Sequence, residues 1–327
     1  MGRFVFPDGK RFAFTVVDDT DVATVENVRP IYRLLEELGM RTTKTVWPVA
    51  CPEGSRAFSS SETLEDAEYR DFLVDLKNRG FELTWHAATM ESSARERTIA
   101  ALERFRDVFG DYPRIHVSHA NNRENLYWGS DRIDDPVLRW LVGSIWDMKR
   151  GYFQGHVEGS PYWWGDLCAR HVVYARNLTF NHINTVSVNP SIPYRDAARP
   201  LAKWWFSSSD ADDAAAFAEL IRPESQERLE RDGGVCIVAT HFGKRFYDGE
   251  RIHPLFEERI RMLSRRAGWF VPVGQLLDCL REQRESEFLP PGEWRRMQWQ
   301  WAIDSAIRVA RSRLSSRRKP RQTRHTE

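Results

Sequence analysis

Apolar positions along the chain follow two alternating patterns. Residues 11–17 (RFAFTVV) form a run typical of a buried β-strand, and residues 24–38 repeat apolar side chains at helical spacing up to Gly39. Strands that alternate with helices in this way predict a mainly parallel sheet. Seven or eight such units over about 280 residues favour a closed or nearly closed barrel over an open sheet. Further strands are expected at 44–50, 81–87, 114–120, 171–175, 201–207, 235–241 and at the start of 268–280, and further helices at 62–79, 93–109, 211–221, 254–266 and the rest of 268–280.

Two parts of the chain depart from this rhythm. Residues 143–200 are rich in Gly, Pro and aromatic residues, which predicts long loops around one or two strands, and loops of this length usually shape a site. Residues 289–314 are expected to form a C-terminal helix, and residues 315–327 a basic, disordered tail. We therefore predict one α/β domain over residues 1–288, followed by this helix and this tail.

The composition excludes several classes of protein. Lys and Arg number 48 against 47 Asp and Glu, so the net charge of +1 gives no basic field for nucleic acid. The sequence has no signal-like start and no apolar segment of membrane-spanning length, which predicts a cytoplasmic protein. The basic tail leaves open a peripheral contact with an anionic membrane. The four cysteines are far apart, as expected for free thiols.

Side chains capable of catalysis follow several of the predicted strands. Asp18 and Asp19 follow the first strand, and His86, His119 and His241 follow three later ones. In a parallel barrel these strand ends meet at one face. Each residue alone also suits a structural role, since DDTD can form a turn and a histidine can be a core residue. Together, two carboxylates and two or three imidazoles suit a divalent transition metal with a base and an acid beside it, which predicts a metal-assisted hydrolase.

Five segments of the chain form an ordered series: FTVVDDTD, RGFELTWHAATM, a strand ending in a polar turn before YWG, VCIVATHFG and GWFVPVGQLLD. In this order they resemble the landmarks of the polysaccharide deacetylases (carbohydrate esterase family 4). The resemblance covers about residues 10–280 and depends on motif order and spacing more than on identity. It implies a single distorted (β/α)7-type barrel, in which the long aromatic-rich loops would be insertions, and a divalent metal held by one Asp and two His.

The resemblance also implies roles for individual residues. Asp18 would be the general base that activates water on the metal, Asp19 and His86 would be metal ligands, and His241 would be the general acid. The implied activity is hydrolysis of an acetyl amide or ester on an N-acetylated sugar or polysaccharide precursor.

The chain departs from the family pattern at two positions. The second metal histidine normally follows the first by four residues, where this chain has Met90, a poor ligand for Zn, Co, Mn or Ni. His119 is our candidate replacement because it ends the next strand. The third motif normally supplies an arginine that orients the base, and here Asn121, Asn122 or Arg123 are the alternatives.

Aromatic and polar residues near these segments are candidates for contacts with substrate. The backbone around Trp47 is a candidate donor to an oxyanion, and several aromatic side chains suit stacking on sugar rings. The predicted substrate-contacting residues are Trp47, Arg123, Tyr127, Trp163 and Trp164, with Tyr162 as a further aromatic candidate.

Two other functions fit the same sequence. A glycosidase or lyase would need no metal and would pair Asp18 with Glu91 or Glu124 as acid and base. A non-catalytic glycan-binding protein would explain Met90 as the loss of a ligand.

Overall fold

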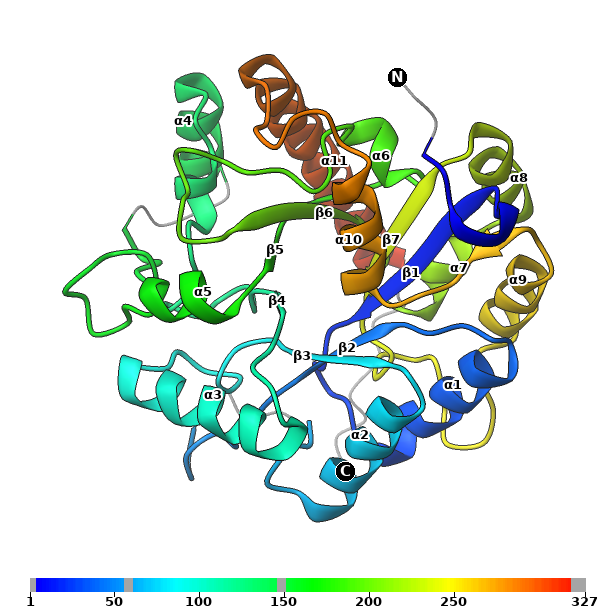
Figure 1. Ribbon diagram of the computed structural model, residues 1–327, viewed down its shortest axis with the longest axis horizontal. Helices are drawn as coiled ribbons and strands as arrows, with labels where there is room; N and C mark the ends of the chain where they lie inside the picture. The colour runs from blue at the N-terminus through cyan, green and yellow to red at the C-terminus, as the bar shows by residue number, and fades with distance from the viewer. Residues whose placement is uncertain (1–3, 56–60, 146–150, 319–327) are drawn as a thin grey trace, which may run out of the picture.

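The computed structural model describes residues 4–55, 61–145 and 151–318. Seven parallel strands form a closed barrel, because β1 pairs with β7 on one side and with β2 on the other. An eighth short strand, β8, pairs with the start of β1. Figure 1 shows helices around the outside of these strands. The strands are β1 Phe12–Asp18, β2 Thr43–Val46, β3 Glu82–Trp85, β4 Ile115–His116, β5 Tyr174–Phe180, β6 Trp204–Asp210, β7 Val235–Thr240 and β8 Gly268–Trp269.

The predicted barrel is therefore confirmed, but several strand limits were wrong. β4 has two residues where seven were expected, and β5 and β6 each begin three residues later than expected. The predicted helices are present, most of them with shorter limits, while α10 and α11 end later than predicted, and α4, α5, α6 and α8 were not predicted. The helices are α1 Val25–Glu37, α2 Ala67–Asn78, α3 Arg95–Phe109, α4 Pro136–Ile145, α5 Gly165–His171, α6 Thr185–Val188, α7 Ala214–Leu220, α8 Pro223–Asp232, α9 Pro254–Ser264, α10 Val273–Glu282 and α11 Pro291–Arg318, with short 3-10 helices at Pro7–Gly9 (η1) and Gly129–Arg132 (η2).

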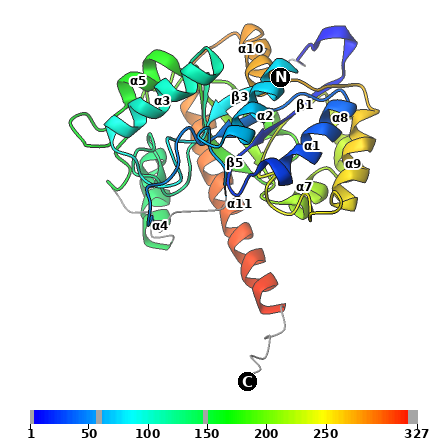
Figure 2. The same cartoon turned by 90° about the horizontal axis from the view of Figure 1, so that it is seen from below.

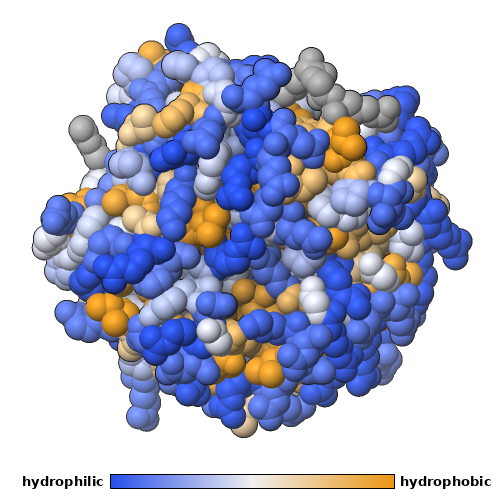
Figure 3. All heavy atoms as spheres, viewed as in Figure 1, coloured by the Kyte–Doolittle hydropathy of each residue, from blue (hydrophilic) through white to orange (hydrophobic). Residues whose placement is uncertain are grey.

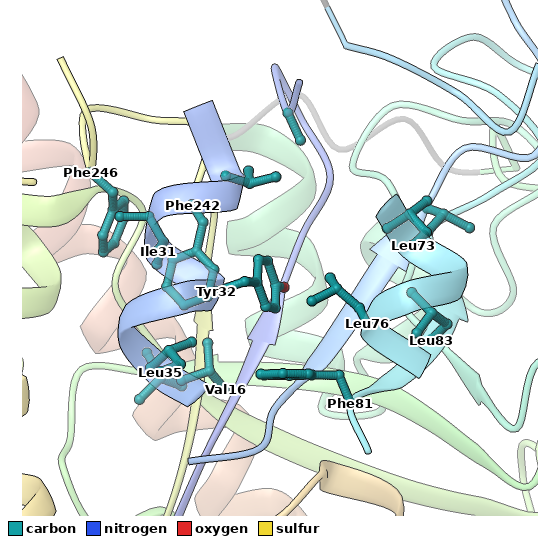
Figure 4. Packing of buried hydrophobic residues seen from close by; sticks show 14 of the residues in the cluster. Val16, Ile31, Tyr32, Leu35, Leu73, Leu76, Phe81, Leu83, Phe242 and Phe246 are labelled. Atoms are coloured by element: carbon teal, nitrogen blue, oxygen red, sulfur yellow. The ribbon is translucent and has the colours of Figure 1, made fainter. Parts of the chain in front are cut away.

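The two faces of β1 belong to two different apolar layers, since successive side chains of a strand point to opposite sides. Ala13 and Val17 pack in the cluster that fills the barrel. Phe14 and Val16 pack in the layer between the strands and the surrounding helices. Figure 4 shows this outer layer, in which the Tyr32 ring of α1 lies among the apolar side chains of neighbouring elements. Residues of even number in β1 therefore face the helices, and residues of odd number face the barrel interior.

The C-terminal helix α11 packs against β5 and α4. It begins at Pro291, close to the predicted start, and ends four residues later than predicted. Figure 2 shows that its far end extends beyond the body of the barrel. The remainder of the predicted basic tail, residues 319–327, lies outside the described residues.

The face of the molecule in Figure 3 is mostly hydrophilic, with apolar side chains in small separate groups. Within the described ranges, no helix combines the length and the apolar character that crossing a membrane requires.

Candidate active site

A cavity of about 800 Å³ opens where the carboxyl ends of the barrel strands meet. The first polar residues after β1, β3, β4 and β7 line this cavity, because parallel strands deliver their ends to one face of a barrel. Side chains of β5 and the end of β6 complete its wall. The chemically active lining residues are Asp19, Asp21, His86, His119, Arg176 and His241.

Three imidazoles face the carboxylate of Asp21. The Nε2 atoms of His86 and His241 lie 3.6 and 3.4 Å from oxygens of Asp21, and Nε2 of His119 lies 3.9 Å from one of them. Burial alone would raise the pKa of Asp21, but contact with His241 and the fields of the other two imidazoles lower it well below its usual range. Asp21 is therefore ionised, and the Nε2 atoms of three imidazoles lie around its carboxylate group.

The ring nitrogen of His86 that faces Asp21, Nε2, carries no proton. Its Nδ1 lies 2.9 Å from the carbonyl oxygen of Val117, which can only accept a hydrogen bond, so Nδ1 carries the proton. Burial lowers the pKa of His86 to about 4, against the opposing effect of nearby Asp19 and Asp21. The ring is neutral at pH 7, and its Nε2 lone pair points at a carboxylate.

His119 is oriented in the same way by Asn122. The Asn122 amide nitrogen donates to the carbonyl oxygens of Thr89 and Glu91 and to the carboxyl group of Glu124. Its Oδ1 is thereby turned toward Nδ1 of His119, 3.0 Å away, and accepts a hydrogen bond from the N–H at that atom. The Nε2 atom of His119 is left to face Asp21.

This arrangement fits a divalent cation in its chemistry. Two lone pairs and a carboxylate that face one another repel unless a proton or a cation lies between them. Ligands placed about 2 Å from one tetrahedral ion lie about 3.4 Å from each other, close to the spacings between Asp21 and both His86 and His119. Across the described ranges, no group of three or more His, Cys, Asp or Glu side chains meets the closer spacing of an assembled metal site. Small movements of Asp21 and His119 would be needed to close the group around an ion.

Asp19 forms a two-pronged ion pair with Arg176 of β5. Nη1 and Nη2 of Arg176 donate to the two carboxylate oxygens over 3.2 and 2.7 Å. Burial would raise the pKa of Asp19, but Arg176, followed by His86 and His241, lowers it. The carboxylate is therefore ionised and fixed in orientation at the cavity wall, as expected for an oriented proton acceptor.

His241 is held between two carboxylates. Its Nδ1 lies 3.0 Å from Oδ1 of Asp212, while its Nε2 faces Asp21. Burial would lower the pKa of His241, but the contacts with Asp21 and Asp212 outweigh it and raise the pKa to about 10. The ring is consequently an imidazolium that can give a proton to a group in the cavity.

Asp18 lies on the other side of the barrel wall, away from the cavity. Its Oδ2 accepts hydrogen bonds from the Tyr32 hydroxyl and from Nζ of Lys44, both over 2.8 Å, and its Oδ1 accepts from the backbone N–H of Phe242. Lys44 is its register partner on β2, and both side chains are fully buried. The structure therefore does not bring the predicted base together with the other site residues.

The predicted substrate-contacting residues also lie outside the cavity lining. Trp47 is fully buried and packs its ring against the rings of His86 and His119. Trp164 is buried with its indole N–H donating to the carbonyl oxygen of Glu124. The remaining three make contacts elsewhere: Arg123 with Tyr162, Tyr127 with His156, and Trp163 through its carbonyl oxygen with Arg95.

The residues on which the alternative functions depended also lie away from the cavity. Met90 is buried beside Trp47 in a small apolar cluster. Glu91 pairs with Arg97, and Glu124 accepts hydrogen bonds from Ser93 and Asn122. Neither glutamate lines the cavity, so neither is placed to act with Asp18 as an acid and base pair.

Sequence reasoning missed three residues of this site: Asp21, Arg176 and Asp212. Asp21 follows Asp19 at a spacing of two, which in extended chain returns a side chain to the same face. Arg176 interrupts the apolar run that predicts β5, and a charge inside a buried strand usually has a specific partner. Asp212 gave no such signal, because it lies in an acidic loop after β6.

The comparisons with known proteins support the fold. No family model and no curated protein matches this chain. Among solved structures, the PuuE allantoinase and a probable polysaccharide deacetylase from Pseudomonas aeruginosa PAO1 each align with a TM-score of 0.52 and 11% identity. Each alignment covers 87% of this chain and 95% of the other. The chain is thus a divergent protein with the barrel fold of a probable polysaccharide deacetylase, in agreement with the resemblance of its motifs.

Proposed function

We propose that this protein is a metal-dependent hydrolase that removes an acetyl group from an N-acetylated sugar or polysaccharide precursor in the cytoplasm. The observation that carries the proposal is the Asp21 carboxylate faced by the Nε2 atoms of His86 and His119, with the Nδ1 atom of each ring fixed by its own acceptor. Such outer acceptors typically orient histidines that bind metals. The fold shared with a probable polysaccharide deacetylase supports the choice of reaction.

The ligand set of the proposal is Asp21, His86 and His119. A divalent ion such as Zn, Co, Mn or Ni, when bound there, would polarise a carbonyl group and lower the pKa of water. The sequence analysis expected Asp19 as the carboxylate ligand, whereas this proposal assigns that role to Asp21. His119 remains the proposed substitute for the second histidine of the family pattern, which is Met90 in this chain.

Asp19 takes the role of proton acceptor that the sequence pattern gave to Asp18. Its ion pair with Arg176 fixes both oxygens and keeps the group ionised. An ionised, immobile carboxylate at the wall of the cavity can accept the proton of an attacking water without first losing one of its own.

His241 is the proton donor of the proposal. Asp212 holds Nδ1, and the Nε2–H faces the cavity, from where it can protonate the departing amine. The two proton-transferring groups, Asp19 and His241, thus directly follow two adjacent strands, β1 and β7.

Elemental analysis of the purified protein beside single variants tests the proposal. The wild type is expected to contain about one divalent ion per chain, and Asp21→Asn and His119→Ala to lose it. His253→Ala is the matched control, because His253 caps α9 outside the cavity. Equal metal content in all four proteins would refute the ligand assignment.

Acetate release from a panel of acetylated sugars tests the reaction itself. The proposal expects release by the wild type and none by Asp21→Asn. Sugar binding without release of acetate across the panel would favour the non-catalytic glycan-binding alternative.

A further inference from the structure

The cavity extends beyond the histidine cluster into a second region formed by η2, β5 and α11. This region is defined by Trp128, Arg132, Asn177, Trp301 and Arg308, all of which line the same cavity as Asp19 and Asp21. Two arginines and two indole rings in this part of the lining form a surface that differs in chemistry from the histidine cluster.

Arg132 lies between the two indole rings and is almost completely buried, with 4% exposure. Its guanidinium carbon lies 3.6 Å from the ring centre of Trp128 and 5.4 Å from that of Trp301. The stacking fixes the plane of the guanidinium group, so its N–H groups point in fixed directions. The hydrogen bond from Nη1 to the carbonyl oxygen of Asn177 is long, at 3.4 Å, and Nε is buried without a partner in the described structure.

The charge of Arg132 is uncompensated among the described side chains, unlike that of the other arginines nearby. Arg176 pairs with Asp19, and Arg308 lies 3.4 Å from a carboxylate oxygen of Asp210. No Asp or Glu in the described ranges forms an ion pair with Arg132. Burial, reinforced by the neighbouring positive charges of Arg176, Arg199 and Arg308, lowers the pKa of Arg132 to about 9.

Arg199 shows how this chain treats a buried arginine with a structural role. It is also nearly fully buried and lies over an aromatic ring, that of Trp294. In contrast to Arg132, it is neutralised by Asp134 and Asp196 over 2.5 Å contacts. A buried charge without a counter-charge is costly unless a ligand supplies one.

We propose that Arg132 binds an anionic oxygen group, a phosphate or a carboxylate, of the substrate, so that the molecule hydrolysed at the histidine end is an acidic carbohydrate. A guanidinium held in one plane matches the paired oxygens of either group. The indole rings of Trp128 and Trp301 flank the site and provide apolar surface for the adjoining sugar. This assignment deepens the proposed function and rests on it for the identity of the reacting group.

Calorimetric titration of the full-length protein, as purified, with inorganic phosphate tests the binding site without any turnover. We expect Arg132→Met to weaken phosphate binding at least about tenfold, and Arg132→Lys, which keeps the charge but loses the planar pair of donors, to weaken it less. Arg195→Met is the control, since Arg195 also lies over an aromatic ring but outside the cavity. Unchanged phosphate binding in both Arg132 variants would overturn the proposal, as would equal weakening by the control, which would indicate an adventitious ion only.

The thermal stability of the same variants separates a binding role from a structural one. Because Arg132→Met removes an unpaired buried charge and retains an apolar side chain between the rings, its melting temperature without phosphate should equal or exceed that of the wild type. A melting temperature lowered by many degrees in both Arg132→Met and Arg132→Lys would mean that Arg132 supports the fold, and would overturn the proposal.

Acetate release from matched sugars then identifies the source of the anion. The substrates are N-acetylglucosamine, its 1-phosphate and an N-acetylated uronic acid. We expect the wild type to prefer one of the two acidic sugars at least about tenfold in kcat/KM, and Arg132→Met to lose this preference. Equal rates on neutral and acidic sugars would overturn the anion site and leave the proposed function intact. Phosphate binding that depends on Arg132 without acetate release from any sugar would overturn the proposed function and leave the anion site intact.

Discussion

Asp18 and Asp19 are neighbours in sequence, yet they occupy two regions of the molecule with opposite properties. The Asp18 carboxylate lies in the closed layer between strands and helices, where its partner Lys44 is equally buried. Asp19 lies at the cavity, where its partner Arg176 comes from another strand and the histidine cluster is close. Both are ion pairs inside the protein. The first can act only on the stability of the barrel, whereas the second can also act on a molecule in the cavity.

The largest effect on stability is expected from Asp18→Asn, which leaves Lys44 charged and unpaired in the outer layer. Removal of one partner of a buried pair costs about 3–5 kcal/mol, and we expect a loss of this size in the free energy of unfolding, measured by urea denaturation. The double variant Asp18→Asn with Lys44→Met removes both charges and should recover most of the loss. A change below about 1 kcal/mol in the single variant would contradict the structural role of this pair.

Asp19→Asn should affect turnover instead. Loss of a general base typically slows a reaction by about 10²–10⁴, so we expect acetate release to fall at least about 100-fold while bound metal is retained. The measurements are kcat on an acetylated sugar and elemental analysis of the same preparation. If Asp19→Asn kept its turnover while the folded fraction of Asp18→Asn lost turnover, the roles assigned to the two aspartates would be reversed.

Glu124 differs from both aspartates, because it is a buried carboxyl group that forms no ion pair within the described part of the chain. Burial raises its pKa to about 7, against hydrogen bonds from Ser93 and Asn122 that lower it. The native state therefore binds its proton more tightly than the unfolded state, in which the pKa is close to 4.5. The resulting stabilisation is complete below pH 4.5 and is lost as the pH rises through 7, with an upper limit of about 3–4 kcal/mol, since one pKa unit corresponds to about 1.4 kcal/mol.

Urea denaturation at pH 5 and pH 8 tests this assignment. Glu124→Gln should reduce the difference in unfolding free energy between the two pH values. Glu91→Gln is the control, since Glu91 pairs with Arg97 near the surface. An unchanged difference in Glu124→Gln would contradict the raised pKa.

The smallest effect is expected from Asn122→Ala, which removes the acceptor of the His119 Nδ1 proton. Outer partners of metal-binding histidines typically contribute 10–100-fold in metal affinity, and we expect a loss in this range. Competition with a chelating dye measures the affinity, and Asn121→Ala serves as the neighbouring control. Equal affinity in both variants would show that Asn122 does not orient His119.

Much of this molecule could be predicted from the sequence. Apolar runs that alternate with segments of helical periodicity were enough to predict the barrel. Because polar residues follow these runs, His86, His119 and His241 could be placed at one face of it, and all three line the cavity. These predictions depend only on the direction of parallel strands, which the closed topology fixes. The two-residue β4 did not alter the outcome, because His119 still follows it into the cavity.

The pattern of residues could not decide which of Asp18 and Asp19 faces the cavity. Both faces of β1 are buried and apolar, as in other parallel sheets, so no polar alternation marks the inner side. The family resemblance implied that both lie in the site, with Asp18 as the general base and Asp19 as a metal ligand. Arg176 was missed for a related reason, since its role depends on a partner more than 150 residues away along the chain.

Aromatic residues were predicted least well. Trp47 and Trp164 look suited to sugar stacking in the sequence, but large rings also stabilise the core, and both are buried there. Trp128 and Trp301 line the cavity, and Trp301 does so while also packing in the apolar cluster under α11. The position of Trp301 depends on how α11 packs against β5, which no local pattern specifies.

The packing of α11 has a consequence for how the lining of the cavity can change between related proteins. The helix brings Trp301 and Arg308 to the cavity, while every residue assigned to proton transfer or metal binding comes from the strands and loops before it. Part of the proposed recognition surface thus lies on a terminal segment that carries no reactive residue, although Arg132 itself belongs to η2. Exchange of this terminal segment between related chains would alter the surroundings of Arg132 without replacing any residue of the reactive centre.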